Sequence, residues 1–174
     1  MSESVRHHRE SAPEAIRAAV LTISDTRTPE TDTGGDVAEE LLGGAGHEVV
    51  AREIVRDEAT SIRNTLVDLL ARSDVDAVVT TGGTGISGRD TTYEVVDRMI
   101  EKKLDGFGEL FRMLSYEEIG AAAVLSRAVA GTVGAKLVAS LPGSRNAVRL
   151  GVGKLLVPEI AHIVFELRKH QEKG

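Results

Sequence analysis

Short aliphatic runs that alternate with segments of helical spacing constrain the fold of this chain most strongly. The runs cover residues 18–24, 47–55 and 75–80, and helical spacing follows the first two over residues 37–42 and 61–71. Strands that alternate with helices predict right-handed crossovers and a parallel sheet covered on both faces. Because aromatic residues make up only 3% of the chain, the core must consist of aliphatic side chains. We therefore expect an α/β fold.

The rest of the chain predicts further elements of both kinds. Helices are expected over residues 92–103 and 107–119. Strand-like runs over residues 127–133 and 136–141 are joined across Gly134, either as a hairpin or as successive strands of the sheet. Residues 146–169 have helical spacing that Pro158 should kink or divide.

Length and charge limit the classes of protein to consider. The 174 residues suffice for one sizeable core, so we expect a single domain over residues 16–174 after a flexible tail over residues 1–15. A net charge of −6 without a basic block argues against nucleic-acid binding. No apolar stretch approaches the roughly 20 residues of a membrane span, and no secretory signal is recognisable. The absence of cysteine fits a reducing compartment, and we expect a cytoplasmic location.

Residues 78–90 form the most informative segment, because a buried strand leads there into four glycines and then into an expected helix. In open α/β sheets, ligands bind just beyond the carboxyl ends of the strands. Glycines let successive backbone N–H groups approach an anion closely and allow a positive φ. Thr84 and Ser87 add hydroxyl donors, and Arg89 adds a fork for phosphate. The segment therefore predicts an anion site.

Asp90 conflicts with a bare anion site, because a carboxylate repels phosphate unless a cation lies between them. Mg²⁺ is such a cation, and it is usually held by one or two carboxylates together with substrate phosphates. The alternative is that Asp90 only caps the following helix. After four glycines at a strand end, we favour the functional interpretation.

Two other nucleotide motifs fit this segment less well. Gly83, Gly85 and Gly88 satisfy G-x-G-x-x-G, but the dinucleotide fingerprint also needs a strand ending in an acid about 20 residues later. The sequence near Asp105 is helical instead. A P-loop needs Gly-Lys followed by Ser or Thr, whereas Gly88 precedes Arg89 and Asp90.

The segment resembles the signature of the molybdenum-cofactor biosynthesis family, which is an apolar triplet, then Thr-Gly-Gly-Thr-Gly, then four residues and Asp. The resemblance extends from about residue 17 to residue 168, and FGELFRMLS at residues 107–115 is typical of the MoaB branch rather than the MogA branch. Further similar segments are residues 23–25, 32–35, 45–49, 125–131 and 141–144.

The resemblance implies both a fold and a reaction. The fold is a three-layer α/β/α sandwich with a mostly parallel central sheet, assembled as homo-oligomeric trimers or hexamers. The reaction joins molybdopterin and ATP into adenylyl-molybdopterin and pyrophosphate, with Mg²⁺ as cofactor and other proteins of the pathway as partners. Relatives without this activity depart from the sequence that is intact here as Arg89-Asp90-Thr91-Thr92, which favours an active enzyme.

The resemblance also assigns roles to individual residues. Asp90 matches the essential acid of the family and Asp57 a second acid, and both are expected to hold Mg²⁺. The loop for nucleotide and pterin corresponds to Gly82, Gly83, Thr84 and Gly85, and the lining of the pterin pocket to Ser126, Pro142, Gly143 and Ser144. Arg145 departs from the proline that many relatives have after this turn. Asp25 and Arg89 complete the candidate binding residues.

Several residues also have a structural interpretation. Asp25 and Asp32 lie in a loop where acids often serve turns and caps. Asp57 could cap the next helix, and Glu94 could be an acid favoured by the helix dipole. Arg127 and Lys136 are candidate phosphate contacts, although a solvated charge at a strand end is the commoner case.

Two other functions compete with the adenylyltransferase. A pterin-binding or scaffold protein of the same pathway would have the same fold and pocket but perform no chemistry. A dinucleotide-dependent oxidoreductase would need an acid that this sequence does not have at the expected place.

Overall fold

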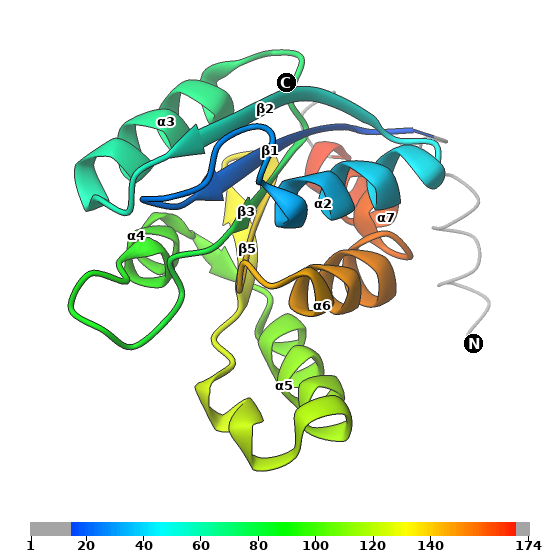
Figure 1. Cartoon of the computed structure of the whole chain (residues 1–174). Helices are drawn as coiled ribbons and strands as arrows, with labels where there is room; N and C mark the ends of the chain where they lie inside the picture. Colours follow the sequence, from blue (N-terminus) through cyan, green and yellow to red (C-terminus); the bar gives the residue numbers. More distant parts are fainter. Residues whose placement is uncertain (1–14, 170–174) are drawn as a thin grey trace.

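The central feature of the computed structural model, which describes residues 15–169, is one six-stranded sheet with the order β2-β1-β3-β6-β5-β4 (Figure 1). The pairs β2–β1, β1–β3 and β3–β6 are parallel, whereas β6–β5 and β5–β4 are antiparallel. The sheet is therefore mostly parallel, as predicted. In chain order the strands are β1 (Arg17–Ile23), β2 (Glu48–Val55), β3 (Ala77–Thr81), β4 (Lys102–Lys103), β5 (Val129–Val133) and β6 (Lys136–Leu141).

Helices cover both faces of the sheet and complete the three layers (Figure 1). One face carries α3 (Ala59–Ala71) and α4 (Thr92–Met99). The other face carries α2 (Thr33–Gly44), α5 (Asp105–Ile119), α6 (Arg145–Val148), the π-helix η2 (Arg149–Leu156) and α7 (Ile160–Arg168). The 3₁₀ helix η1 (Gly120–Leu125) follows α5. The expectation of an α/β/α sandwich is confirmed.

Side chains of the buried strands point alternately to the two faces of the sheet and pack in two separate hydrophobic cores. In β3, Ala77 and Val79 pack in the core under α2 and α7, and Val78 packs in the core under α3 and α4. This alternation is the period of two that a strand imposes on its side chains. It places Thr80, the next residue on the Val78 face, on the side of the sheet that α3 and α4 cover, near the end of the strand.

The segment after α4 differs from the prediction. Helical spacing predicted a helix over residues 92–103, but α4 ends at Met99 and Lys102–Lys103 form the edge strand β4. The backbone N–H groups of Glu101 and Leu104 donate to carbonyls of β5, at 2.8 Å in both cases. Residues 101–104 therefore pair with the edge of β5 instead of continuing α4, because pairing with a distant strand outweighs local helical preference.

The last two strands and the C-terminal helices settle two open points. β5 and β6 form an antiparallel hairpin across Gly134, whose φ is +57°, so the hairpin alternative is correct. Residues 146–169 are divided near Pro158, as predicted, with η2 ending at Leu156 and α7 beginning at Ile160. The expected tail lies outside the described residues except for Ala15. Within residues 15–169, no helix is both long and apolar enough to cross a bilayer.

Candidate active site

The carboxyl ends of the four parallel strands bring most of the candidate residues to one edge of the sheet. Asp25 follows β1, Asp57 follows β2, the glycine loop begins directly after β3, and the turn at residues 142–144 follows β6. This is the edge at which open α/β sheets bind ligands. The structure therefore places these candidate residues at the end of the strands that the sequence predicted.

The glycine loop is packed so closely that its first residues must be glycines. Gly82 and Gly83 have φ values of +93° and +62°, whereas Gly85 and Gly88 do not have a positive φ. The N–H of Gly82 donates to the carbonyl of Leu141 at 3.0 Å, and a Cβ on Gly82 would overlap the carbonyl oxygen of Ile23. The loop is thus wedged between the ends of β1 and β6.

Asp90, at the C-terminal end of the glycine loop, bonds back to the loop through its side chain. Its Oδ2 accepts the backbone N–H of Ser87 at 2.9 Å, and a Cβ on Gly85 would lie 2.5 Å from the same oxygen. Hydrogen bonds from Ser87 lower the pKa of Asp90, so the group is charged at neutral pH. The residue at the N-cap of α4 is Thr91. The capping interpretation of Asp90 is therefore wrong.

Asp57 reaches the same loop from the end of β2. Its Oδ1 accepts the backbone N–H of Thr91 at 3.1 Å and the hydroxyl of Thr91 at 3.0 Å. A Cβ on Gly83 would lie 2.6 Å from Oδ2 of Asp57. The alternative that Asp57 caps α3 is wrong, because Glu58 occupies that position. Two carboxylates therefore lie against this loop. Asp57 is next to Gly83 and Thr91, and Asp90 is next to Gly85 and Ser87.

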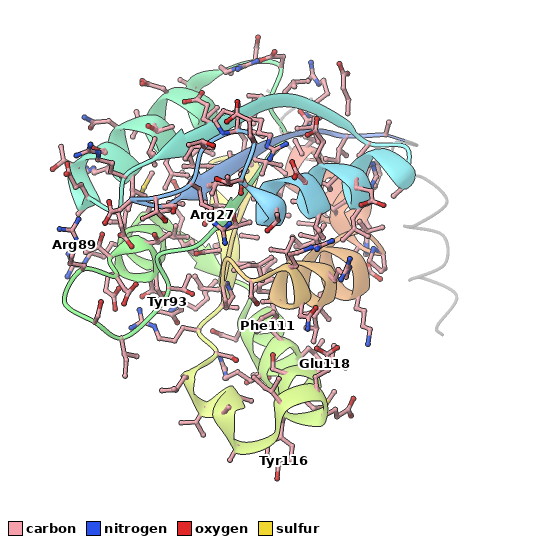
Figure 2. All side chains as sticks on the ribbon, in the orientation of Figure 1. Arg27, Arg89, Tyr93, Phe111, Tyr116 and Glu118 are labelled. Atoms are coloured by element: carbon pink, nitrogen blue, oxygen red, sulfur yellow. The ribbon has the colours of Figure 1, made fainter. Side chains whose placement is uncertain are left out.

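Asp25 connects Asp57 with Arg89. Its Oδ1 accepts the backbone N–H of Asp57 at 3.3 Å, and its Oδ2 accepts Nη2 of Arg89 at 2.8 Å. The Arg89 side chain is 71% exposed and lies on the outer side of the loop (Figure 2). A cavity of about 540 Å³ adjoins Asp25. Its lining is Ser24, Asp25, Arg27, Thr28, Pro29, Arg52, Ile54, Val55 and Arg56.

The expected pterin-pocket residues gather at a second, smaller cavity. Ser126, Pro142 and Ser144 line a space of about 100 Å³ together with residues of α5 and α6. Gly143 lies beside the glycine loop, since its Cβ would be 3.1 Å from Cα of Gly82. Ser144 also caps α6 by accepting the N–H of Ala147 at 3.2 Å, so the departure at Arg145 begins a helix.

Comparison with known proteins identifies the family. The chain matches the family described as "Probable molybdopterin binding domain" over residues 19–162. Molybdenum cofactor biosynthesis protein B of Bacillus cereus is 52% identical over 167 residues, covering 95% of this chain and 99% of that protein. The chain belongs to this family of molybdenum-cofactor biosynthesis proteins.

Solved structures agree with this assignment. A crystal structure of Molybdenum cofactor biosynthesis protein B gives a TM-score of 0.89 at 52% identity, covering 92% of this chain and 100% of the other. The tungsten cofactor synthesizing protein MoaB from Pyrococcus furiosus gives 0.81 at 39% identity, covering 90% and 99%. The resemblance to the MoaB branch of the family is thus confirmed, and the matched region contains every candidate site residue.

Two charged residues of this family member make structural contacts. Asp32 is buried, and it caps α2 by accepting the N–H of Gly35 at 3.0 Å while also accepting the hydroxyl of Thr22 at 2.7 Å. Its role is therefore the structural one. Lys136 begins β6 at the opposite edge of the sheet, where its ammonium donates to the carbonyl of Arg72. The interpretation of Lys136 as a phosphate contact is wrong.

Sequence reasoning missed the part of the site that comes from α5. Phe111, Ser115 and Glu118 line the small cavity beside Ser126 and Ser144. Phe111 and Glu118 lie along the inner side of α5 in Figure 2. The sequence predicted a helix over residues 107–119, but no local signal showed that it packs next to the turn after β6.

Proposed function

We propose that this chain catalyses the Mg²⁺-dependent adenylylation of molybdopterin by ATP. The observation that carries the proposal is the pair of carboxylates at the glycine loop, with Asp57 against Gly83 and Asp90 against Gly85. Membership of the family supports molybdopterin as the other substrate. Asp25 lines a cavity of about 540 Å³, and Ser126, Pro142 and Ser144 line a second one of about 100 Å³.

The donor set fits Mg²⁺. Within residues 15–169, no cluster of three or more His, Cys, Asp or Glu side chains is arranged for a metal. A site with only two carboxylates suits an ion that takes its remaining ligands from water and substrate phosphates. Asp57 and Asp90 would hold the ion, which supplies charge neutralisation between the two polyanionic substrates.

The residues of the chain mainly align the substrates. The phosphate of molybdopterin attacks the α-phosphorus of ATP, the bond from that phosphorus to the bridging oxygen breaks, and pyrophosphate leaves. The backbone N–H groups of Gly83 and Thr84 and the hydroxyl of Thr84 orient phosphate oxygens. Ser126 and the turn at residues 142–144 hold the pterin. Arg89, which the Asp25 carboxylate keeps at the rim, neutralises charge on the departing pyrophosphate.

The test is whether purified protein forms adenylyl-molybdopterin and pyrophosphate from molybdopterin and ATP. We expect product with MgCl₂ and none when EDTA removes the metal. The competing function, a scaffold that only binds the pterin, predicts saturable molybdopterin binding without pyrophosphate release. That result would refute the enzymatic proposal.

We also propose that the protein is a homo-oligomer. Large apolar side chains are exposed along α5 and the helix η1 that follows it, and such patches commonly mark protein interfaces. Tyr116 points away from the body of the molecule at the far end of α5 (Figure 2). The exposed side chains are Leu110, Met113, Tyr116, Ile119, Val124 and Leu125. If this surface mediates assembly, Met113→Glu should lower the mass measured by light scattering relative to the unmodified chain.

A further inference from the structure

Buried polar atoms without a partner are concentrated beneath the glycine loop, on the face of the sheet that α4 covers. Within residues 15–169, no hydrogen bond reaches Oγ1 of Thr80, Oγ1 of Thr92, Oγ of Ser140 or Nε of Arg127. Such atoms are uncommon in native proteins and cost folding stability, so their concentration at one place calls for an explanation.

Strand register shows that these atoms belong to one strip. Thr80 of β3 is the register partner of Ser140 in β6, and Ser140 is the register partner of Val129 in β5. Arg127 lies two residues before Val129, and its contacts with Tyr93 and Glu94 of α4 place it on the same face. Thr92 joins the strip from α4, because its backbone N–H donates to the carbonyl of Gly83 at 3.0 Å.

Arg127 is the charged member of the strip. Its guanidinium lies 4.3 Å from the centre of the Tyr93 ring, and Nη2 donates to Oε1 of Glu94 at 2.5 Å. The side chain is 25% exposed. A guanidinium has five N–H donors, and the bond to Glu94 uses one of them. Arg127 is thus fixed in place, while its buried Nε has no partner among the described residues.

A purely structural role explains this arrangement poorly. A guanidinium that only clamps α4 to β5 would satisfy Nε with a carbonyl or a hydroxyl, as buried polar groups generally do. Arg127 instead leaves Nε unpaired within the described residues, although its positive charge contributes to lowering the pKa of Asp90. The positive charge of Arg127 therefore acts on the glycine loop, while its Nε stays available as a donor.

We propose that Arg127 binds a phosphate oxygen of a substrate at the glycine loop, and that Glu94 is its partner only while the site is empty. This proposal rests on the proposed function, because it takes the ligand from that reaction. The planar fork of a guanidinium matches two phosphate oxygens. Stacking on Tyr93 fixes its orientation before the ligand arrives.

Arg127 and Arg89 then differ in what they offer a ligand. Arg89 is bonded to Asp25 at the exposed rim, whereas Arg127 is half-enclosed beside the loop. Charge-assisted bonds in the less exposed position are screened less by salt. The stronger phosphate contact is expected at Arg127.

The experiment measures binding to the full chain by titration calorimetry, with Mg·ATP, inorganic pyrophosphate and molybdopterin as separate probes. Arg127→Met should weaken the phosphate compound that it contacts by about tenfold or more, as expected for a lost charge-assisted bond. Arg127→Lys, which keeps the charge but not the fork, should be intermediate. The probe that weakens identifies whether the phosphate belongs to ATP or to the pterin. Arg63→Met on α3 is the matched control, because Arg63 is an exposed arginine outside the site.

Glu94→Gln separates binding from a structural role. Removing the competing carboxylate should strengthen the same interaction several-fold, while Arg127→Met weakens it. A clamp alone predicts that both variants lower Tm and leave affinity unchanged, and that outcome would overturn the proposal. Equal affinities of Arg127→Met and the unmodified chain for every probe would also overturn it. If the unmodified chain binds ATP but forms no product, the proposed function fails while the binding role of Arg127 is still decided by these titrations.

Discussion

The edge of the sheet where the parallel strands begin (the amino edge) differs from the edge where they end (the carboxyl edge). At the amino edge the buried charge of Asp76 is paired, whereas at the carboxyl edge several buried polar atoms have no partner within residues 15–169. Asp76, which is 3% exposed, accepts the backbone N–H of Arg17 at 2.8 Å and the guanidinium of Arg17 at 3.1 Å, and it also pairs with Arg168. The partners come from the start of β1 and the end of α7. This network joins the two ends of the described chain.

The carboxyl edge has the opposite property. Thr80 and Ser140 carry hydroxyls that are buried and unpaired within residues 15–169, and Arg127 keeps an unpaired Nε. Unsatisfied groups of this kind weaken a fold, so their retention beside a glycine loop points to a role in binding. The buried charge is thus paired within the chain at one edge, whereas the other edge has polar groups that are unpaired among the described residues, as expected if the proposed ligand binds there.

Asp90→Asn should have the largest effect on the carboxyl edge. Turnover of molybdopterin and ATP should fall by about two to three orders of magnitude, because an amide cannot hold the cation that neutralises the transition state. Folding stability should change little, since the amide oxygen can still accept the N–H of Ser87. Product formation and urea denaturation measure the two quantities. Normal turnover in this variant would remove Asp90 from the mechanism.

Asp76→Asn should have the reverse pattern at the amino edge. The free energy of unfolding should fall by about 2 kcal/mol, because hydrogen bonds to a buried charged group are lost. Activity of the folded fraction should be unchanged. Asp74→Asn is the matched control, since Asp74 forms a more exposed pair with Arg72, and exposed pairs contribute little to stability. Equal losses in the two variants would contradict the difference in burial.

The contrast between the edges also shows what the sequence could and could not predict. The glycine loop and Asp90 were predicted from a local motif at a strand end, and Asp57 was predicted from the resemblance to the family; parallel strands bring such ends to one edge. Chemistry that depends on a few consecutive residues can be identified before the fold is known.

The unpaired strip could not be found in this way. Thr80 and Ser140 are 60 residues apart in the sequence and become neighbours only through the register of β3 and β6. The pair Glu94–Arg127 and the edge strand β4 likewise depend on contacts across the sheet. Asp32 was ambiguous for the same reason, because its role as a cap is decided by the geometry of α2.

Thr80→Val tests the cost of the unpaired strip directly. The side chains are nearly equal in shape, and removing a buried hydroxyl without a partner should stabilise the fold by about 1 kcal/mol. The expected sign is opposite to that at Asp76. Urea denaturation should show a higher midpoint with an unchanged slope. A lower midpoint would mean that the hydroxyl has a partner in solution, and the contrast between the edges would then be smaller than the structure indicates.

The smallest effect should be a pH dependence that originates at the amino edge. His47 is buried, accepts the backbone N–H of Ile16 at 3.4 Å, and has a pKa that burial lowers from its usual value. Well above pH 6.5, His47 is neutral in the folded and the unfolded chain and adds no pH dependence. As the pH falls below that value, the unfolded chain binds a proton first, so stability decreases until the folded form also becomes protonated. His47→Asn keeps an acceptor for Ile16 without a titrating group, and its unfolding midpoint between pH 7.5 and 5 should vary less than that of the unmodified chain. Identical pH profiles would exclude His47 as the source.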